Sequence, residues 1–359
     1  MKQIFDGNRP LAEASTLPSS TYLSSEYYDK ELKQVFGKEW HWACRTEQVN
    51  QPGQWITTQI GNESIVVSRD SEGILRAFSN VCRHRAAKVC RVSQGQSTRL
   101  RCQYHGWTYD LAGNLKTAPE FQGVSHFNCE QHSLPSFQVE ELGPWLFVCL
   151  ASEAPNFLAQ WKPFLEQSES FQIDQMKFVK RVEYPLNCNW KVFVDNYLDG
   201  GYHINTLHPD LAGLIPYSDY RSEIFEKSSL QTAPLKSNLQ KESAKVRKGT
   251  AQYWWLYPNL MINLYEGVMD LNLVIPEGPN NCRVVFDFYF KDISDLNQPQ
   301  IEQSLKIAHQ IQMEDQGICE EVQEGLQSAF YTSGRFSVLR EQTAYHFHQL
   351  LAREAGLFE

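Results

Sequence analysis

The stretch NVCRHRAAKVCRVSQGQSTRLRCQYHGW, residues 80–107, holds two cysteine–histidine pairs and one further cysteine. One residue separates Cys82 from His84, two separate Cys102 from His105, and seventeen lie between the pairs. Each pair follows a run with strand-like character, so we expect two tight loops on a β scaffold that grip one compact centre. Cys90 lies between the pairs and is interpreted as a packing residue, because buried free cysteines behave as small apolar side chains.

Three interpretations of the two pairs remain open on spacing alone. They are scattered core cysteines with surface histidines, a structural zinc ion with two cysteine and two histidine ligands, and a [2Fe–2S] cluster of the Rieske type. Zinc modules usually place at least two residues between paired ligands, so a C-x-H pair is tight for one tetrahedral ion. In a Rieske cluster one iron takes two thiolates and the other two imidazoles, so each loop gives one ligand to each iron.

The stretch DNYLDGGYHINTLHPDL, residues 195–211, offers a second pair of possible metal ligands. Four residues separate His203 from His208, a spacing that suits a single metal poorly on a continuous helix. The Gly200–Gly201 pair and Pro209 indicate an interrupted helix, which lets the two imidazoles converge. Taken alone the pattern is weak, because two histidines near a helix end are more often structural than ligating.

A Rieske cluster transfers single electrons, so substrate chemistry on the same chain needs a terminal acceptor. Two histidines and one carboxylate form the facial triad that holds non-haem Fe(II) and leaves positions open for O2. We predict that the carboxylate is Asp315, in the helical stretch IQMEDQGICEEVQEGL of residues 311–326. Glu314 is the competing acid, and helical geometry directs it another way.

The bulk composition narrows the class of protein. The chain has 359 residues, 42% of them hydrophobic, and a net charge of −9 without a basic cluster, which argues against nucleic-acid binding. No apolar run approaches the length of a membrane span, and the first residues lack a signal or transit pattern. Nine cysteines, an odd number thinly spread, fit reduced thiols better than a disulfide framework, so a cytoplasmic location is expected.

The order of strand-like and helical segments along the sequence predicts two folded domains of the α+β class. Residues 1–43 are expected to be a helical leader that packs on the catalytic domain, with Ser24 or Ser25 as an N-cap. Residues 44–152 read as an all-β domain of short strands, and residues 153–359 as an antiparallel sheet with helices on one face. The polar segment 225–250 is predicted to be a mobile surface loop.

The combined motifs resemble one family over nearly the whole chain. NVCRHR and CQYHGW, followed by DNYLDGGYHINTLH and MEDQGICEEVQEGL, are similar to the catalytic α subunit of Rieske non-haem iron oxygenases. NWKVFVDNYLDGGYH, YPNLMINLY and RVVFDFYF further resemble the choline monooxygenase subgroup and its bacterial relatives. This resemblance implies an N-terminal Rieske domain, a C-terminal helix-grip domain, and a homotrimer in which the cluster of one subunit faces the iron of its neighbour.

The resemblance also implies roles for individual residues. In this family an acid that lies three residues before the first iron histidine usually bridges the two centres. That position is Gly200 in this sequence, so the bridge is assigned to Asp199, one residue earlier. Asp195 lies further back. Asn196 is expected near the iron. The implied cluster ligands are Cys82, His84, Cys102 and His105, and the implied ligands of the mononuclear Fe(II) are His203, His208 and Asp315.

The expected partners are O2, a small cationic substrate, and a ferredoxin or flavin-dependent reductase as electron donor, because no G-x-G-x-x-G motif is present. Choline, oxidised to betaine aldehyde, is the predicted substrate; the alternatives are N-demethylation of a betaine or carnitine-like compound and hydroxylation of an aromatic ring. A non-enzymatic electron carrier or a zinc-stabilised binding module is the rival from another class. Aromatic faces bind quaternary ammonium groups, so the predicted substrate residues are Tyr253, Trp255, Tyr257 and Tyr265, with Glu266 as a charge partner.

Overall fold

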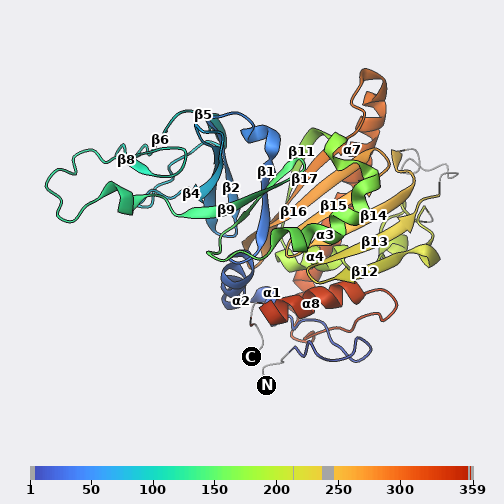
Figure 1. Cartoon of the computed structure of the whole chain (residues 1–359). Helices are drawn as coiled ribbons and strands as arrows, with labels where there is room; N and C mark the ends of the chain where they lie inside the picture. The colour runs from blue at the N-terminus through green and yellow to red at the C-terminus, as the bar shows by residue number, and fades with distance from the viewer. Residues whose placement is uncertain (1–4, 213, 237–245, 355, 357–359) are drawn as a thin grey trace. The chain divides into compact units, whose positions relative to one another are not determined.

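The computed structural model describes residues 5–212, 214–236, 246–354 and 356 (Figure 1). The chain divides into two compact units, one made of Phe36–Phe157 and the other of the residues up to Val35 together with those from Leu158 onward. The predicted leader therefore contributes to both units, because its last residues begin a strand at Trp40. Its helix α2 (Ser25–Glu31) starts where predicted, and the Ser24 hydroxyl accepts a hydrogen bond from the Glu26 N–H.

The first unit is built from antiparallel strands, as predicted. Alternating apolar residues bury one face of its larger sheet, and tight turns join neighbouring strands. The strand order of this sheet is β1-β10-β9-β4-β3-β2-β5. Its strands are β1 (Trp40–Arg45), β2 (Gln54–Ile60), β3 (Glu63–Arg69), β4 (Leu75–Ser79), β5 (Gln94–Gln96), β9 (Ser136–Leu142) and β10 (Trp145–Cys149).

A small three-stranded sheet consists of β6 (Leu100–Arg101), β7 (Thr108–Tyr109) and β8 (Leu115–Thr117). It carries the second cysteine–histidine loop, between β6 and β7, whereas the first loop follows β4 and is flanked by an isolated bridge between Val81 and Lys88. The turn between β7 and β8 contains Gly113 at φ +83°. The Asp110 carboxylate accepts the backbone N–H of Asn114 at 2.8 Å in the same turn. Gly113 and Asn114 therefore lie in the turn of a β-hairpin formed by β7 and β8.

The second unit is a seven-stranded antiparallel sheet with the order β11-β17-β16-β15-β14-β13-β12. Its strands are β11 (Lys177–Leu186), β12 (Arg221–Phe225), β13 (Ser228–Pro234), β14 (Thr250–Leu256), β15 (Leu260–Tyr265), β16 (Val268–Gly278) and β17 (Asn281–Phe290). Its helices are α1 (Ser20–Leu23), α2, α3 (Phe157–Ser168), α4 (Trp190–Tyr197), α5 (Ile204–Leu207), α7 (Gln298–Leu326) and α8 (Gln342–Glu354). None of the helices in the described part of the chain is long and apolar enough to cross a membrane.

Helices lie on both faces of this sheet, which corrects the expectation of a single covered face. Side chains alternate along β14, so Trp254 and Trp255 point in opposite directions. The Trp255 ring contacts Phe347 of α8, with centroids 5.4 Å apart, on the side that faces α4 and α7. The Trp254 ring contacts Phe164 of α3 on the opposite side, with centroids 5.5 Å apart.

The segment 225–250 is not one surface loop, which corrects another expectation. Residues 228–234 form β13, an inner strand of the sheet paired with β12 and β14. Its buried polar side chains include Gln231, which donates to the Tyr197 carbonyl at 2.9 Å. Val246 and Arg247 are buried as well, while residues 237–245 lie outside the described residues. The polar composition of residues 228–234 did not reveal the strand, because its pairing with β12 and β14 and its burial arise only in the tertiary fold.

Candidate metal centres and substrate cavity

The two loops of the first candidate centre have the same backbone hydrogen bonds. In each loop the cysteine N–H donates at 2.8 Å to the carbonyl five residues ahead, and the cysteine carbonyl accepts at 3.0 Å from the amide four residues ahead. That fourth residue has positive φ in both loops, 57° at Ala86 and 76° at Gly106. The two loops therefore present Cys82 and Cys102 in matching backbone frames.

Burial separates the four candidate ligands into two types. The thiols of Cys82 and Cys102 are buried, whereas His84 is half-buried and His105 is exposed. The two imidazole rings are 4.5 Å apart by centroids, and His84 Nδ1 is buried without a hydrogen-bond partner among the described residues. An unpartnered histidine nitrogen together with two buried thiols fits a cluster in which one iron is bound by the cysteines and the other by the histidines.

Two neighbouring side chains fit the same interpretation. The Tyr109 hydroxyl lies 3.3 Å from Cys82 Sγ and accepts the Arg83 N–H at 3.1 Å, so its own hydrogen can point at the sulfur. Such hydrogen bonds to cluster sulfurs help to set the reduction potential. Cys90 is different: burial raises the pKa of its thiol to about 12, which matches the packing role predicted for it.

The second candidate centre depends on a break between α4 and α5. Gly200 and Gly201 have φ of +69° and +73°, a region that side chains disfavour. A Cβ at Gly200 would overlap the backbone oxygen of Arg340. The interruption predicted from the glycine pair is therefore present. His203 and His208 lie at the two ends of the short helix α5 that follows it, with Nε2 atoms 3.1 Å apart.

We expect Gly200→Ala to destabilise the protein and to weaken iron binding, because the new methyl group would clash with the backbone of Arg340. A positive φ alone costs about 1–2 kcal/mol. Gly267→Ala is the matched control, since Gly267 has φ +73° and a methyl group added there would meet nothing within 4 Å. Thermal unfolding and iron content should both fall further for Gly200→Ala; equal losses in the two variants would contradict this account.

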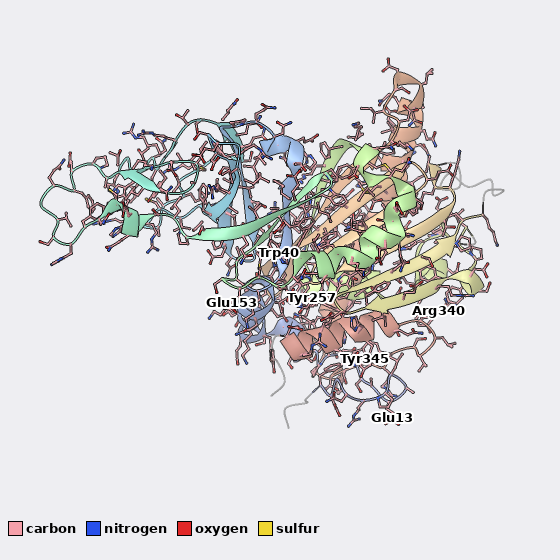
Figure 2. All side chains as sticks on the ribbon, in the orientation of Figure 1. Glu13, Trp40, Glu153, Tyr257, Arg340 and Tyr345 are labelled. Carbon is pink, nitrogen blue, oxygen red and sulfur yellow. The ribbon has the colours of Figure 1, made fainter. Side chains whose placement is uncertain are left out.

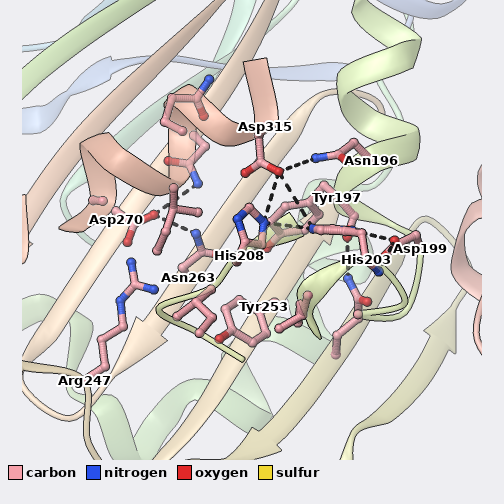
Figure 3. Close-up of a pocket in the computed structure, with 18 of the residues that line it drawn as sticks. Asn196, Tyr197, Asp199, His203, His208, Arg247, Tyr253, Asn263, Asp270 and Asp315 are labelled. Atoms are coloured by element: carbon pink, nitrogen blue, oxygen red, sulfur yellow. Dashed lines mark hydrogen bonds and ion pairs between the residues drawn. The ribbon is translucent and has the colours of Figure 1, made fainter. Parts of the chain in front are cut away.

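Three side chains of the second unit form one candidate ligand set. Asp315 Oδ1, on α7, lies 3.3 Å from His208 Nε2 and 3.8 Å from His203 Nε2 (Figure 3). The donor atoms of these three residues all lie within 4.8 Å of one another. Burial lowers the pKa of His208, but Asp315 and Glu314 raise it by more, so the position favours positive charge. The set matches the two-histidine, one-carboxylate pattern of non-haem Fe(II).

Two further carboxylates fix the histidine rings. His203 Nδ1 lies 2.5 Å from Asp199 Oδ2, and His208 Nδ1 lies 2.7 Å from Glu314 Oε2. When each Nδ1–H donates to a carboxylate, each Nε2 keeps its lone pair for a metal. Two nitrogens facing each other at 3.1 Å, with a carboxylate oxygen beside them, can share a proton or hold a metal ion between them. Glu314 was predicted to point away; it contacts this site through the outer edge of His208.

The remaining acids and amides near the site have distinct partners. Asn196 Nδ2 donates to Asp315 Oδ1 at 2.8 Å, which places it beside the candidate iron site as expected. Asp199 also accepts the backbone N–H groups of Tyr202 and His203, at 3.1 and 3.0 Å. Asp195 does not contact His203 or His208. Its carboxylate accepts a hydrogen bond from the Tyr22 hydroxyl at 2.6 Å and lies 2.8 Å from Nε2 of another histidine, His348. Of the acids considered for the bridge, Asp199 is the one that contacts a candidate iron ligand.

A cavity of about 120 Å³ opens beside the candidate iron site. Its wall includes the candidate ligands at one end and Arg247 and Asp270 at the other (Figure 3). Aromatic rings form much of the lining between them: Phe193, Tyr197, Tyr220, Tyr253, Tyr265 and Phe286. The sequence pattern predicts Tyr253 and Tyr265 and misses the other four, which come from α4, β17 and the loop before β12.

Three of the predicted substrate residues are not among those that line this cavity. Trp255 shares a sheet face with Tyr253 but lies further along β14, under α8, and its Nε1–H donates to the Pro258 carbonyl at 3.2 Å. Tyr257 (labelled in Figure 2) is buried beyond the end of that strand. Glu266 sits in the turn after β15, beside Gly249, and lines a separate hollow. Alternation assigns a face but not a position along the strand, which is why these three were misplaced.

The two units and their sites define an oxygenase that receives electrons at one centre and activates O2 at another. Comparison with known proteins gives the family. Residues 39–135 match the Rieske [2Fe-2S] domain, and residues 173–355 match the ring hydroxylating alpha subunit (catalytic domain). The chain belongs to the Rieske non-haem iron oxygenases, which carry a Rieske cluster and a mononuclear iron. The zinc and simple electron-carrier interpretations are thereby excluded, and the predicted fold class and cofactors are confirmed.

Individual relatives are similar over nearly the full length. Choline monooxygenase, chloroplastic, of Arabidopsis thaliana is 36% identical over 358 residues, covering 97% of this chain and 84% of the relative. The carnitine monooxygenase oxygenase subunit of Escherichia coli (strain K12) is 28% identical, covering 95% and 94%. The crystal structure of the quaternary ammonium Rieske monooxygenase CntA in complex with substrate L-carnitine superposes with a TM-score of 0.84, at 25% identity and 99% and 100% coverage.

Proposed function

We propose that this chain hydroxylates a carbon atom bonded to the quaternary nitrogen of a small substrate, or the alcohol carbon next to it. The observation that carries the proposal is the aromatic cavity that opens directly onto the candidate iron ligands. Each ring face contributes about 0.5–2 kcal/mol to binding a quaternary ammonium group, which has no N–H and therefore donates no hydrogen bond. The names of the similar proteins, choline and carnitine monooxygenase, denote substrates with this group.

Two positions of attack fit this reaction. Hydroxylation of the alcohol carbon of choline gives betaine aldehyde through its hydrate, while hydroxylation of an N-methyl group releases formaldehyde and leaves a tertiary amine. In either case one oxygen atom of O2 enters the product, and the other leaves as water with two electrons and two protons. An aromatic hydrocarbon fits less well, because it would leave the buried guanidinium of Arg247 without a polar partner in the cavity.

The chain's own residues position the two metal centres. When bound, the Rieske cluster supplies single electrons and the mononuclear iron activates O2. We assign Cys82, His84, Cys102 and His105 to the cluster. We assign His203, His208 and Asp315 to the iron. Asp199 and Glu314 hold the imidazole tautomers, and Asn196 orients the Asp315 carboxylate by donating to Oδ1.

The source of the electrons and the assembly complete the proposal. A ferredoxin or flavin-dependent reductase is proposed as the donor, in keeping with the absence of a nucleotide-binding motif in this sequence. We propose a homotrimer in which Asp199 links the iron site to the cluster of a neighbouring subunit. Inter-subunit electron transfer is named in the description of the CntA structure. A cytoplasmic location remains a prediction.

Substrate-dependent O2 uptake tests the proposed function. The iron-replete protein would be supplied with NADH and a surrogate reductase, and offered choline, glycine betaine, carnitine, γ-butyrobetaine and a simple arene. We expect O2 uptake coupled to product with at least one quaternary ammonium compound, with betaine aldehyde or formaldehyde identified by mass. Coupled turnover of the arene alone would refute the proposal.

A further inference from the structure

Arg247 is a buried cation that faces the substrate cavity. The residue is 8% exposed, lies just before β14 and lines the cavity beside Asp270 (Figure 3). Its guanidinium lies over the Tyr265 ring, 5.0 Å from the centroid. No hydrogen bond or ion pair joins it to any residue that the structure describes. A guanidinium has five N–H donors in a planar fork, so this one needs acceptors that the described chain does not supply.

Asp270, the acid that lines the cavity beside Arg247, does not satisfy this need. Asp270 Oδ2 accepts from the side-chain amides of Asn263, at 2.7 Å, and Asn272, at 3.1 Å. Burial raises the pKa of Asp270, and the positive charge of Arg247 offsets this only in part. Asp270 therefore acts on Arg247 through its charge and leaves the N–H donors of the guanidinium without a partner among the described residues.

Other polar atoms of the same cavity are also without partners. Gln312 lies on α7, one turn before Asp315, and its Nε2 is buried without a hydrogen-bond partner among the described residues. The same holds for Asn272 Oδ1. A purely cationic ligand would place its charge in one cavity with a buried guanidinium, and could use neither the N–H donors of Arg247 nor that of Gln312.

We propose that the substrate carries a carboxylate as well as a quaternary ammonium group, and that Arg247 binds that carboxylate. This inference rests on the proposed function and specifies its substrate class as a betaine-type zwitterion. Arg247 and the candidate iron ligands lie at opposite ends of the cavity, with aromatic rings between them. A carboxylate at Arg247 thus directs the methylated nitrogen toward the iron site. Choline has a hydroxyl where the betaines have a carboxylate, so it lacks the anion that the guanidinium requires.

The test compares affinities in the iron-loaded, cluster-loaded protein under anaerobic conditions, by calorimetry. Choline and glycine betaine form a matched pair, because they share the trimethylammonium group and differ in hydroxyl against carboxylate. We expect wild type to bind glycine betaine, carnitine or γ-butyrobetaine at least about tenfold more tightly than choline. Arg247→Met should reduce the betaine-to-choline affinity ratio about 10- to 100-fold, the range for a charge-assisted hydrogen bond.

Lys248→Met is the matched control, since it removes the same charge from the next residue, which is exposed and outside this cavity. It should leave the ratio unchanged. Arg247→Lys keeps the charge without the planar fork and should lie between wild type and Arg247→Met. If Arg247→Met does not fold, the wild-type ratio alone decides, and tighter binding of choline overturns the inference.

The outcomes also separate this inference from the proposed function. If choline is turned over and the betaine-to-choline affinity ratio is the same in wild type and Arg247→Met, the carboxylate assignment is overturned and the proposed function stands. Failure of every quaternary ammonium compound to bind or to turn over would overturn both.

Discussion

Asp315→Ala is expected to remove the mononuclear iron and abolish turnover, while the Rieske cluster remains. Asp315 supplies the single carboxylate of the candidate ligand set, from a different helix than the two histidines. Loss of an outer-shell partner of a metal ligand typically costs 10–100-fold in affinity or activity. Loss of a direct ligand should exceed that, so turnover should fall by more than about 100-fold.

Iron per chain and the visible spectrum of the cluster measure this result separately. We expect one iron fewer per chain and an unchanged cluster spectrum, because the cysteine–histidine loops lie in the other unit. Glu321→Ala is the control: it removes an exposed carboxylate from the same helix. If Asp315→Ala keeps its iron, or if Glu321→Ala loses it, Asp315 is not the ligand.

The candidate metal residues could be predicted from sequence because their geometry is local. A C-x-H loop and a C-x2-H loop fix their own backbone turns, and the structure gives both the same hydrogen-bond frame. The Gly200–Gly201 pair similarly indicated where the helix had to break for His203 and His208 to meet. Asp315 depended on more than spacing, since two adjacent acids competed. Both face the site: Asp315 lies beside the inner nitrogens, and Glu314 contacts the outer nitrogen of His208.

The substrate cavity could not be predicted in the same way, because its residues meet only through the tertiary fold. Tyr197, Tyr220 and Phe286 come from separate elements, and no spacing in the sequence relates them. Among the cavity residues, Arg247 was the hardest to predict from sequence, because it lies near the end of a polar segment whose composition is typical of a surface loop. Trp255 shares the sheet face of Tyr253, and the strand pattern alone could not show that α8 covers it.

Asp199→Asn is the second change expected to have a large effect: both metal sites should stay loaded while turnover falls by more than about 100-fold. The amide keeps an oxygen that can accept from the backbone N–H groups of Tyr202 and His203, so the loop should hold its shape. What it loses is the negative charge beside His203 Nδ1. We propose that this carboxylate also links the iron site to the cluster of the neighbouring subunit. The amide of asparagine cannot provide that link.

Glu314→Gln separates the two roles of Asp199. Glu314 holds His208 Nδ1 at 2.7 Å much as Asp199 holds His203 Nδ1 at 2.5 Å, but no bridging role is proposed for it. Loss of ring orientation alone should cost about 10–100-fold in either variant. A bridge predicts a further loss in Asp199→Asn, seen as slow reoxidation of the pre-reduced cluster when O2 and substrate are added in a single turnover. Matching reoxidation rates in the two variants would reduce Asp199 to a positioning residue for His203 and leave the route between subunits to another group.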